Sequence, residues 1–194
     1  MRDSKKADRK AAIENAALEL FSQLGFMKTT ISLIAERAGF GTGTLYNYFK
    51  TKGDILFSII EKRSCGYVEE LDCIIKENIG FLESLMLFHD AYLNSLSLYN
   101  KVIWRECMAS IFSGDAELMK SINEVDRPYL ERLNILFFKF QKTGIISETA
   151  DIESMIATLY DADMYAILTY LADEDMPLAT LKNRLTMHAK MITS

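Results

Sequence analysis

Residues 31–52 read ISLIAERAGFGTGTLYNYFKTK, and this stretch decides the fold of the N-terminal part of the chain. Its apolar residues recur at helical spacing up to Ala38, and Gly39 follows them, as glycine often does just past a helix end. A second short helix is predicted next, because Leu45 and Phe49 lie four residues apart and so share one face. Two short helices joined by a glycine turn predict a helix-turn-helix, whose second helix fits the major groove of DNA.

Further residues at fixed spacing extend the motif on both sides: Ala16, Ala17, Leu20, Phe21, Gly25, Thr29, Thr30, Ile34, Ala35, Ala38, Gly39, Gly43, Thr44, Leu45, Tyr46, Tyr48, Phe49, Lys50 and Lys52. With these positions, residues 13–56 resemble the N-terminal domain of the TetR-like (tetracycline-repressor) family of bacterial transcriptional regulators. Three residues depart from the family pattern. Gly41 stands where a serine usually caps the second helix, Ser32 where an arginine is common, and Leu33 where an acidic residue is usual.

The resemblance implies an all-α fold with two domains. Residues 1–52 would form a three-helix DNA-binding domain, and residues 53–194 a helical domain for effector binding and dimerisation. The implied function is that of a dimeric DNA-binding regulator, a repressor that binds a palindromic operator and is released by a small apolar or amphiphilic ligand. The alternative is a helical small-molecule-binding or carrier protein with a vestigial helix-turn-helix, which would show no salt-dependent binding to its own promoter.

The resemblance also assigns roles within the DNA-binding domain. Thr30, Tyr46, Tyr48 and Lys52 would hold backbone phosphates. Thr42, Gly43, Thr44 and Asn47 would lie nearest the bases. Lys28 and Lys50 complete the predicted DNA-binding residues.

The charge distribution favours a single DNA-facing end. The net charge of the chain is −5, yet residues 1–52 hold nine of its 22 basic residues and only five of its 27 acidic ones. A basic head on an acidic body is typical of a protein that touches phosphates at one end. An ordinary solvated helix surface would explain the basic head equally well.

Composition favours long helices, because the 194 residues include only 9 Gly and 2 Pro and 49% of them are hydrophobic. No apolar run approaches the roughly 18 residues that a membrane span needs. The charged N-terminus lacks the apolar segment of a signal peptide. We therefore expect a cytoplasmic protein that does not contact a membrane.

No residue pattern indicates catalysis, a metal or a cofactor. The two histidines, His89 and His188, lie far apart in the sequence. The three cysteines, Cys65, Cys73 and Cys107, form no pair at metal-ligand spacing. We expect no enzymatic activity, no cofactor and buried reduced thiols, with a redox sensor as the alternative interpretation of the cysteines.

Helical patterns continue outside the motif. A disordered basic arm is predicted at residues 1–6, followed by a helix at residues 7–24. A capping box at residues 51–54 predicts the start of a long helix after the motif. Four or five more helices follow, and Pro128 is expected either to kink a long helix at residues 115–142 or to begin a fresh one.

The last two helical patterns form a pair, at residues 151–172 and 178–192. The first is strongly apolar, and its small Ala162 and Ala166 allow another backbone to approach closely. From the residues alone, core and dimer seam are equally good interpretations. The resemblance implies that both helices form the homodimer interface.

The effector pocket is predicted from large flexible or aromatic side chains and from polar residues in apolar stretches. The aromatic and flexible candidates are Met86, Phe88, Tyr92, Trp104, Met108, Tyr129, Phe137 and Met164. The polar candidates are His89, Arg105 and Asp161, and the acidic residues Asp90, Glu106 and Asp163 interrupt the same apolar stretches. Alternatively, the apolar candidates fill the core and Arg105 pairs with an acidic neighbour. Several acids around one arginine slightly favour a cationic or polar-aromatic effector over an anion.

Overall fold

The computed structural model describes the backbone of residues 2–111 and 116–193 and, within these ranges, every side chain except those of residues 2–4, 63–65, 106, 107, 110, 111 and 116–125. The described residues form helices joined by turns, with no strand among them. This confirms the predicted all-α fold class.

The chain folds into two compact units. The first unit comprises Met1–Arg63 and Tyr99–Val125, and the second comprises Ser64–Leu98 and Asp126–Ser194. Helix α4 (Lys52–Lys76) contributes its first half to one unit and its second half to the other. The predicted domain boundary coincides with the start of α4 and stays a prediction.

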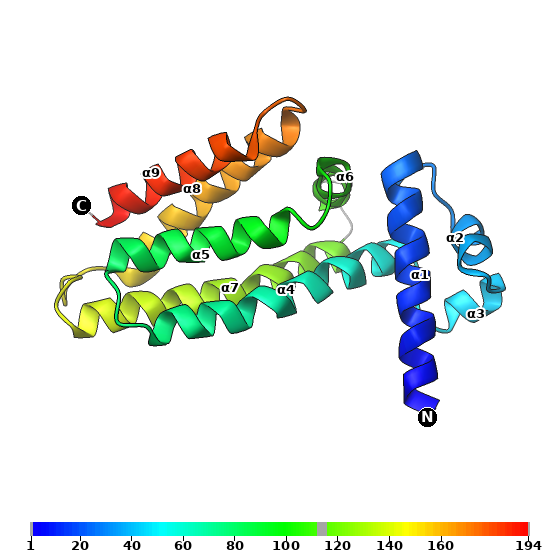
Figure 1. The fold of residues 1–194 in the computed structure, drawn as a ribbon, viewed down its shortest axis with the longest axis horizontal. Helices are drawn as coiled ribbons and strands as arrows, with labels where there is room; N and C mark the ends of the chain where they lie inside the picture. The colour runs from blue at the N-terminus through cyan, green and yellow to red at the C-terminus, as the bar shows by residue number, and fades with distance from the viewer. Residues whose placement is uncertain (1, 112–115, 194) are drawn as a thin grey trace. The chain divides into compact units, whose positions relative to one another are not determined.

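The first unit contains α1 (Arg2–Leu24), α2 (Ile31–Ala38), α3 (Thr42–Tyr46), the start of α4 and α6 (Lys101–Ile111) (Figure 1). Helix α2 packs against both α1 and α3, as in a helix-turn-helix. Helix α1 begins at Arg2, the second residue of the chain. The predicted disordered arm at residues 1–6 is therefore wrong for residues 2–6, which are helical. This stretch contains neither Gly nor Pro, so nothing in it stops the helix.

Hydrogen bonds at the helix ends set the geometry of the motif. The hydroxyl of Thr30 accepts a hydrogen bond from the backbone N–H of Leu33 at 3.2 Å and caps α2. Gly39 ends that helix with a φ of 75°, which a residue with a Cβ rarely adopts. Thr51 Oγ1 accepts from the backbone N–H of Asp54 at 3.1 Å, and the Asp54 carboxylate accepts from the backbone N–H of Thr51 at 3.0 Å. The predicted capping box is confirmed.

Apolar side chains from each helix of the motif meet in the core of the first unit. Phe21 of α1, Ile34 of α2 and Leu45 of α3 are fully buried. Phe49 is also buried, as predicted, but α3 ends at Tyr46 and Phe49 lies beyond the helix in which the sequence placed it. Each such side chain contributes about 1.5–3 kcal/mol through burial, which makes this core the main force that holds the two short helices on α1.

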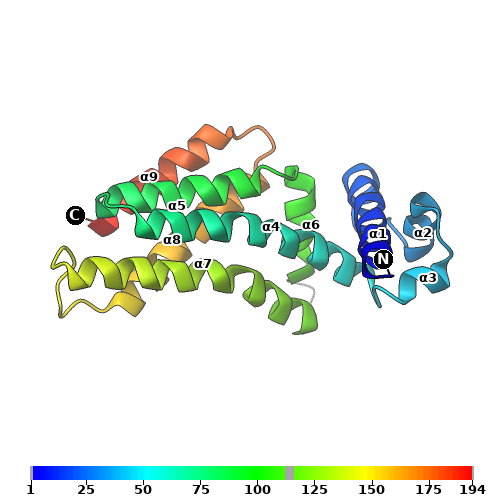
Figure 2. The same ribbon diagram turned by 60° about the horizontal axis from the view of Figure 1, so that its bottom comes forward.

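The second unit contains the rest of α4 together with α5 (Phe81–Leu96), α7 (Ala116–Lys142) from Asp126 onward, α8 (Ile152–Ala172) and α9 (Leu178–Thr193). Helix α9 lies against α5 and α8 (Figures 1 and 2). Pro128 lies inside α7, which continues through it as one helix, so a fresh helix at that position is wrong.

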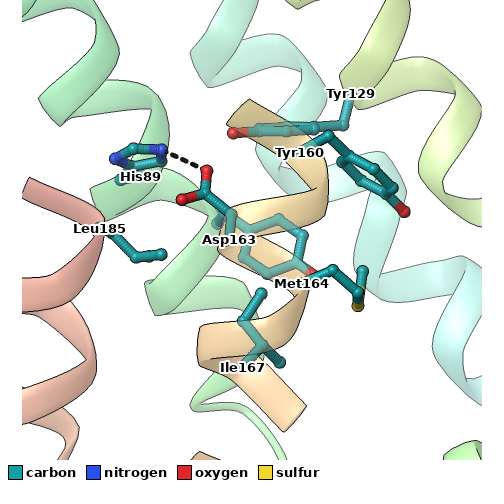
Figure 3. A pocket seen from close by; sticks show the side chains of 8 residues that line it. His89, Tyr129, Tyr160, Asp163, Met164, Ile167 and Leu185 are labelled. Carbon is teal, nitrogen blue, oxygen red and sulfur yellow. Dashed lines mark hydrogen bonds and ion pairs between the residues drawn. The ribbon is translucent and has the colours of Figure 1, made fainter. Parts of the chain in front are cut away.

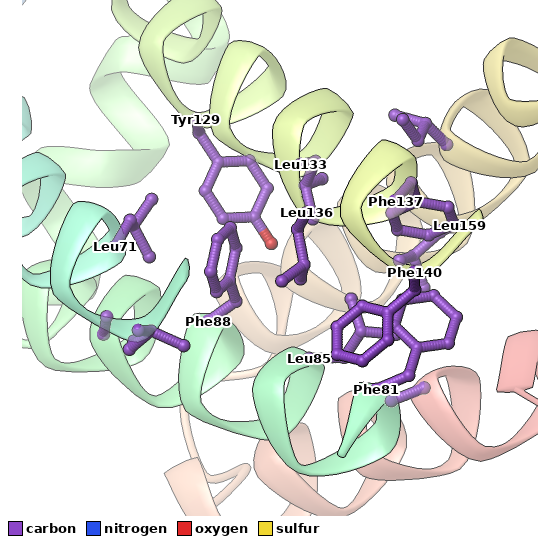
Figure 4. Close-up of a cluster of buried hydrophobic side chains, with 14 of the residues drawn as sticks. Leu71, Phe81, Leu85, Phe88, Tyr129, Leu133, Leu136, Phe137, Phe140 and Leu159 are labelled. Atoms are coloured by element: carbon purple, nitrogen blue, oxygen red, sulfur yellow. The ribbon is translucent and has the colours of Figure 1, made fainter. Parts of the chain in front are cut away.

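Aromatic rings fill the core of the second unit (Figure 4). The centroid of the Phe81 ring lies 4.9 Å from those of Phe137 and Phe140. Tyr129 tilts against Phe88 with a centroid distance of 6.2 Å. Phe88 and Phe137 are fully buried, and truncating such a ring to alanine costs about 3–5 kcal/mol.

Candidate functional site

Helix α3 presents the predicted base-contacting residues to solvent. Leu45 and Phe49 turn into the core, and this anchoring leaves the opposite side of the short helix accessible. The exposed or half-buried residues there are Thr42, Gly43, Thr44, Tyr46, Asn47 and Tyr48. Lys28, Thr30 and Lys50 are exposed as well. Polar, aromatic and basic groups on one accessible surface suit contacts with both phosphates and base edges.

The ammonium group of Lys52 points to the protein backbone, although the resemblance assigns it to a phosphate. Its Nζ donates to the carbonyl oxygens of Phe26 at 2.7 Å, Thr29 at 3.2 Å and Met27 at 3.4 Å. It also lies 4.3 Å from the centroid of the Phe26 ring, within range of a cation–π contact. Lys52 therefore ties the start of α4 to the loop between α1 and α2 and positions the motif.

A buried carboxylate fixes the first half of α4 on α1. Glu14 is 4% exposed and accepts a hydrogen bond from the hydroxyl of Ser58 at 2.8 Å. It also forms an ion pair with Lys62, and Lys10 lies 3.7 Å from one of its oxygens. Because a buried charge requires partners, the contacts of Glu14 with Ser58 and Lys62 hold the two helices in one arrangement.

The second unit contains a small pocket between α5, α7, α8 and α9 (Figure 3). Its lining consists of His89, Tyr92, Tyr129, Tyr160, Asp163, Met164, Ile167 and Leu185. The free volume of this partly open pocket is about 10 Å³, close to what one water molecule needs. A larger ligand therefore requires the lining side chains to move.

Both histidines of the chain meet at one aspartate beside this pocket. His89 Nε2 on α5 lies 2.8 Å from Asp163 Oδ2, and His188 Nδ1 on α9 lies 2.8 Å from Asp163 Oδ1. Asp163 on α8 is only 7% exposed, so two rings rather than bulk water hold its carboxylate. This His89–Asp163–His188 chain links three helices. The other ring nitrogen of His89, Nδ1, is buried and makes no hydrogen bond with the described residues.

Two tyrosines of the pocket keep their protons at neutral pH. The hydroxyl of Tyr160 donates to Asp126 Oδ2 at 2.7 Å, and burial, followed by the charge of Asp126, raises the pKa of Tyr160 far above its usual value. Burial and then the charge of Asp163 raise the pKa of Tyr129 in the same direction. Figure 3 shows the Tyr129 hydroxyl pointing toward the His89–Asp163 pair. The pocket thus contains the phenolic O–H of Tyr129 beside the Asp163 carboxylate, which is already bonded to two histidines.

The structure brings four of the predicted pocket residues together. His89, Tyr92, Tyr129 and Met164 line the pocket. Phe88 and Phe137, also predicted, lie in the adjoining aromatic core.

The other predicted pocket residues lie elsewhere. Met86 and Asp161 are exposed on α5 and α8. Trp104, Arg105 and Met108 belong to α6 in the first unit, where Trp104 is buried with its ring centroid 6.0 Å from that of Tyr99. They take no part in lining the pocket of the second unit.

Four lining residues are not among the predicted pocket residues: Tyr160, Asp163, Ile167 and Leu185, although Asp163 is one of the polar residues that interrupt an apolar stretch of the sequence. Tyr160, Met164 and Ile167 lie four and three residues apart on α8, so extending the pattern from Met164 along one face would have found two of them. Leu185 comes from another helix, and no local pattern relates it to the others.

Other expectations concern metals, membranes and thiols. Among the described residues, no three His, Cys, Asp or Glu side chains are grouped to hold a metal ion. None of the described helices is long and apolar enough to cross a membrane. Cys73 is exposed, so the prediction of buried thiols is wrong for this residue. The side chains of Cys65 and Cys107 lie outside the described residues.

Comparison with known sequences agrees with the geometry of the first unit. The family model of bacterial regulatory proteins of the tetR family matches residues 13–59. Over 173 residues, 88% of each chain, the sequence is 28% identical to the fatty acid metabolism regulator protein of Bacillus subtilis. Over 64 residues it is 41% identical to the HTH-type transcriptional regulator HbdR of an Aromatoleum species, which covers 33% of this chain and 28% of HbdR.

Solved structures extend the similarity to the whole chain. The transcriptional regulator FadR of Bacillus subtilis in complex with stearoyl-CoA is 25% identical, with a TM-score of 0.73 over 95% of this chain and 97% of FadR. Thermus thermophilus FadR, a TetR-family repressor in complex with lauroyl-CoA, shares the fold with a TM-score of 0.75 at 22% identity, over 94% of this chain and 92% of that one. Residues 13–59 thus match the tetR family of bacterial regulatory proteins, and the chain as a whole shares the fold of the two solved FadR regulators.

Proposed function

We propose that this protein is a cytoplasmic, homodimeric transcriptional repressor that leaves a palindromic operator when a long-chain acyl-CoA or a related amphiphile enters the second unit. The observation that carries the proposal is similarity to fatty acid regulators of Bacillus subtilis in both sequence and structure. The sequence is 28% identical to the fatty acid metabolism regulator protein over 88% of both chains. The structure resembles FadR in complex with stearoyl-CoA, 25% identical over 95% of this chain.

The pocket of the second unit supports an amphiphile. Met164, Ile167 and Leu185 supply an aliphatic wall that suits an alkyl chain. The carboxylate of Asp163 is already held by two histidines, so it has little attraction left for a cation. We therefore prefer an amphiphile to the cationic or polar-aromatic effector that the sequence slightly favours.

Exposed apolar residues on α8 and α9 support the homodimer. Tyr165 of α8 and Met187 and Met191 of α9 are 70%, 53% and 70% exposed. Met187 and Met191 lie four residues apart and so share one face of α9, and adjoining exposed apolar side chains are typical of an interface. Ala166, one of the small residues proposed for the seam, is buried within its own protomer, so we place the seam on the exposed methionines instead.

The dimer is tested by the double variant Met187→Glu with Met191→Glu. Both residues are exposed, so the protomer should stay folded while charge repels its partner. We expect sedimentation as a monomer and loss of operator binding, because a single copy of α3, the recognition helix expected to enter the major groove, cannot reach the second half-site. A monomer that binds the operator with full affinity would contradict the proposal.

The effector is tested by titrating stearoyl-CoA into a complex of the protein with DNA from upstream of its own gene, followed by fluorescence anisotropy. Free coenzyme A and stearate serve as separate ligand controls. We expect release by stearoyl-CoA and not by coenzyme A alone.

A matched pair of variants locates the site. Ile167→Trp fills the pocket, whereas Ile135→Trp makes the same change at an exposed position on α7. The Ile167 variant should bind DNA normally and respond less to stearoyl-CoA, and the Ile135 variant should respond like the wild type. Equal responses would place the effector outside this pocket.

A further inference from the structure

An open hollow lies between the first helix and the end of the helix-turn-helix. Lys6, Ala7 and Lys10 of α1 and Tyr48, which follows α3, line a space of about 260 Å³. All four residues belong to the first unit. Both ribbon views show the N-terminal half of α1 beside α3 (Figures 1 and 2).

Helical geometry fixes the two lysines on one side of α1. Lys6 and Lys10 are four residues apart, so their stems lie one above the other on the same face. The helix runs without a break from Arg2, and it therefore holds these lysines in place where a disordered arm would not. The small Ala7 leaves the floor of the hollow open to a ligand of modest size.

The charges beside the hollow are favourable for an anion. Lys10 Nζ lies 5.7 Å from the centroid of the Phe49 ring and 3.7 Å from the Glu14 carboxylate. That carboxylate is already paired with Lys62 and accepts from Ser58, so it does not neutralise Lys10 fully. Among the described side chains, no carboxylate lies within ion-pair distance of Lys6. Two ammonium groups thus flank the hollow on its α1 side.

We propose that Lys6, Lys10 and the hydroxyl of Tyr48 form a phosphate seat that binds one backbone phosphate of the operator. The proposal rests on the proposed function and adds the α1 lysines to the residues that grip DNA. Two ammonium groups supply charge, and the phenolic O–H supplies a directional hydrogen bond to a phosphate oxygen. Because the seat adjoins α3, a phosphate held there fixes how far the recognition helix enters the groove.

The test measures operator affinity against salt concentration for Lys6→Ala, Lys10→Ala and Lys5→Ala. Removing one lysine that neutralises a phosphate reduces the slope of log K against log salt by about one. We expect this reduction for Lys6→Ala and Lys10→Ala. Lys5→Ala removes the same charge from a neighbouring position that does not line the hollow, and should change the slope less.

Tyr48→Phe completes the set, because it removes the hydrogen bond and keeps the ring. It should weaken binding to operator and random DNA by the same factor without changing the slope. If Lys5→Ala lowers the slope as much as the other two variants, the effect is that of diffuse positive charge and the seat is overturned. Circular dichroism of each variant shows that the fold is retained.

Two further outcomes separate the sources of failure. If the wild-type protein shows no salt-dependent DNA binding at all, the proposed function fails. If it binds, and the lysine variants keep the wild-type slope, only the seat fails. Inorganic phosphate added at constant ionic strength should not compete with the operator. Competition that disappears in the Lys6→Ala variant would mark a free-phosphate site and overturn the DNA assignment.

Discussion

The two units use polar side chains in different ways. In the first unit, Thr30 and Asp54 bond to backbone groups three residues away and so determine where α2 and α4 begin. In the second unit, Asp163 bonds to His89 and His188, which lie 74 and 25 residues away in the sequence. Local bonds follow from spacing and appear in a sequence as a motif. Distant bonds exist only after the helices have packed, which explains why the pocket is harder to predict than the DNA-binding surface.

The largest expected effect on this contrast is the difference in stability between the variants Asp163→Ala and Asp161→Ala. Removing Asp163 leaves two largely buried histidines without their partner, and we expect a loss of about 3 kcal/mol in the free energy of unfolding. Asp161 is exposed on the same helix, so its removal should change stability by less than about 0.5 kcal/mol. Urea unfolding at a fixed protein concentration measures both. Similar losses for the two variants would show that the His89–Asp163–His188 chain does not stabilise the second unit.

Alkaline pH should weaken the second unit through its tyrosines. The pKa of Tyr129 is raised in the folded state, whereas the unfolded value is about 10. Above about pH 10 the unfolded chain loses the tyrosine proton, whereas the folded chain keeps it. The free energy of unfolding is therefore unaffected below pH 10 and falls above it, by about 1.4 kcal/mol per pH unit for each such tyrosine. Unfolding followed by tyrosinate absorbance gives the profile. Tyr129→Phe should flatten it, whereas Tyr46→Phe, at an exposed position, should not.

A smaller effect on stability and DNA binding distinguishes the N-terminal caps of α4 and α8. Asp54→Ala removes the capping box of α4 and should cost about 1 kcal/mol in stability. It should also weaken operator binding, because the same carboxylate accepts from the backbone N–H of Lys50 at 2.9 Å. Asp151 caps α8 by accepting from the N–H of Ser154. Asp151→Ala should leave operator binding unchanged, and equal effects on DNA would remove the distinction between the units.

The smallest expected change concerns the salt dependence of Lys52→Met. Because Lys52 bonds to three carbonyl oxygens, we expect this variant to bind all DNA sequences more weakly with the wild-type salt slope. A slope reduced by about one would instead show that Lys52 contacts a phosphate, as the family resemblance implies. Affinities measured at several salt concentrations decide between the two roles.

The sequence predicts the first unit well because its signals are local. Gly39 ends α2, Thr30 caps it and Thr51 begins the capping box, each at a spacing that allows few alternatives. The start of α1 is harder to predict, because polar residues near a terminus resemble a disordered arm. Lys5 and Lys6 nevertheless lie within the helix.

The pocket shows where local signals end. Asp161 and Asp163 both interrupt an apolar stretch, yet they differ by two residues, about 200° around a helix, so one faces solvent and the other the interior. Trp104 is a large aromatic residue of the kind that lines ligand pockets, but it is buried in the first unit, whereas the pocket lies in the second. Such choices depend on which helix faces which, and that information is absent from any single segment.

The contacts of α4 with the helices before it bear on how regulators of this kind can be recombined. A chimera that joined the first 52 residues of this protein to the body of a relative would separate Thr51 from Asp54 and Glu14 from Ser58 and Lys62. The transplanted motif would then fold without its capping partner and with a buried, unpaired carboxylate. A cut after Arg63 keeps these bonds within the donated segment. Engineered sensors that exchange operator specificity should therefore carry the first three turns of α4 along with the recognition helix.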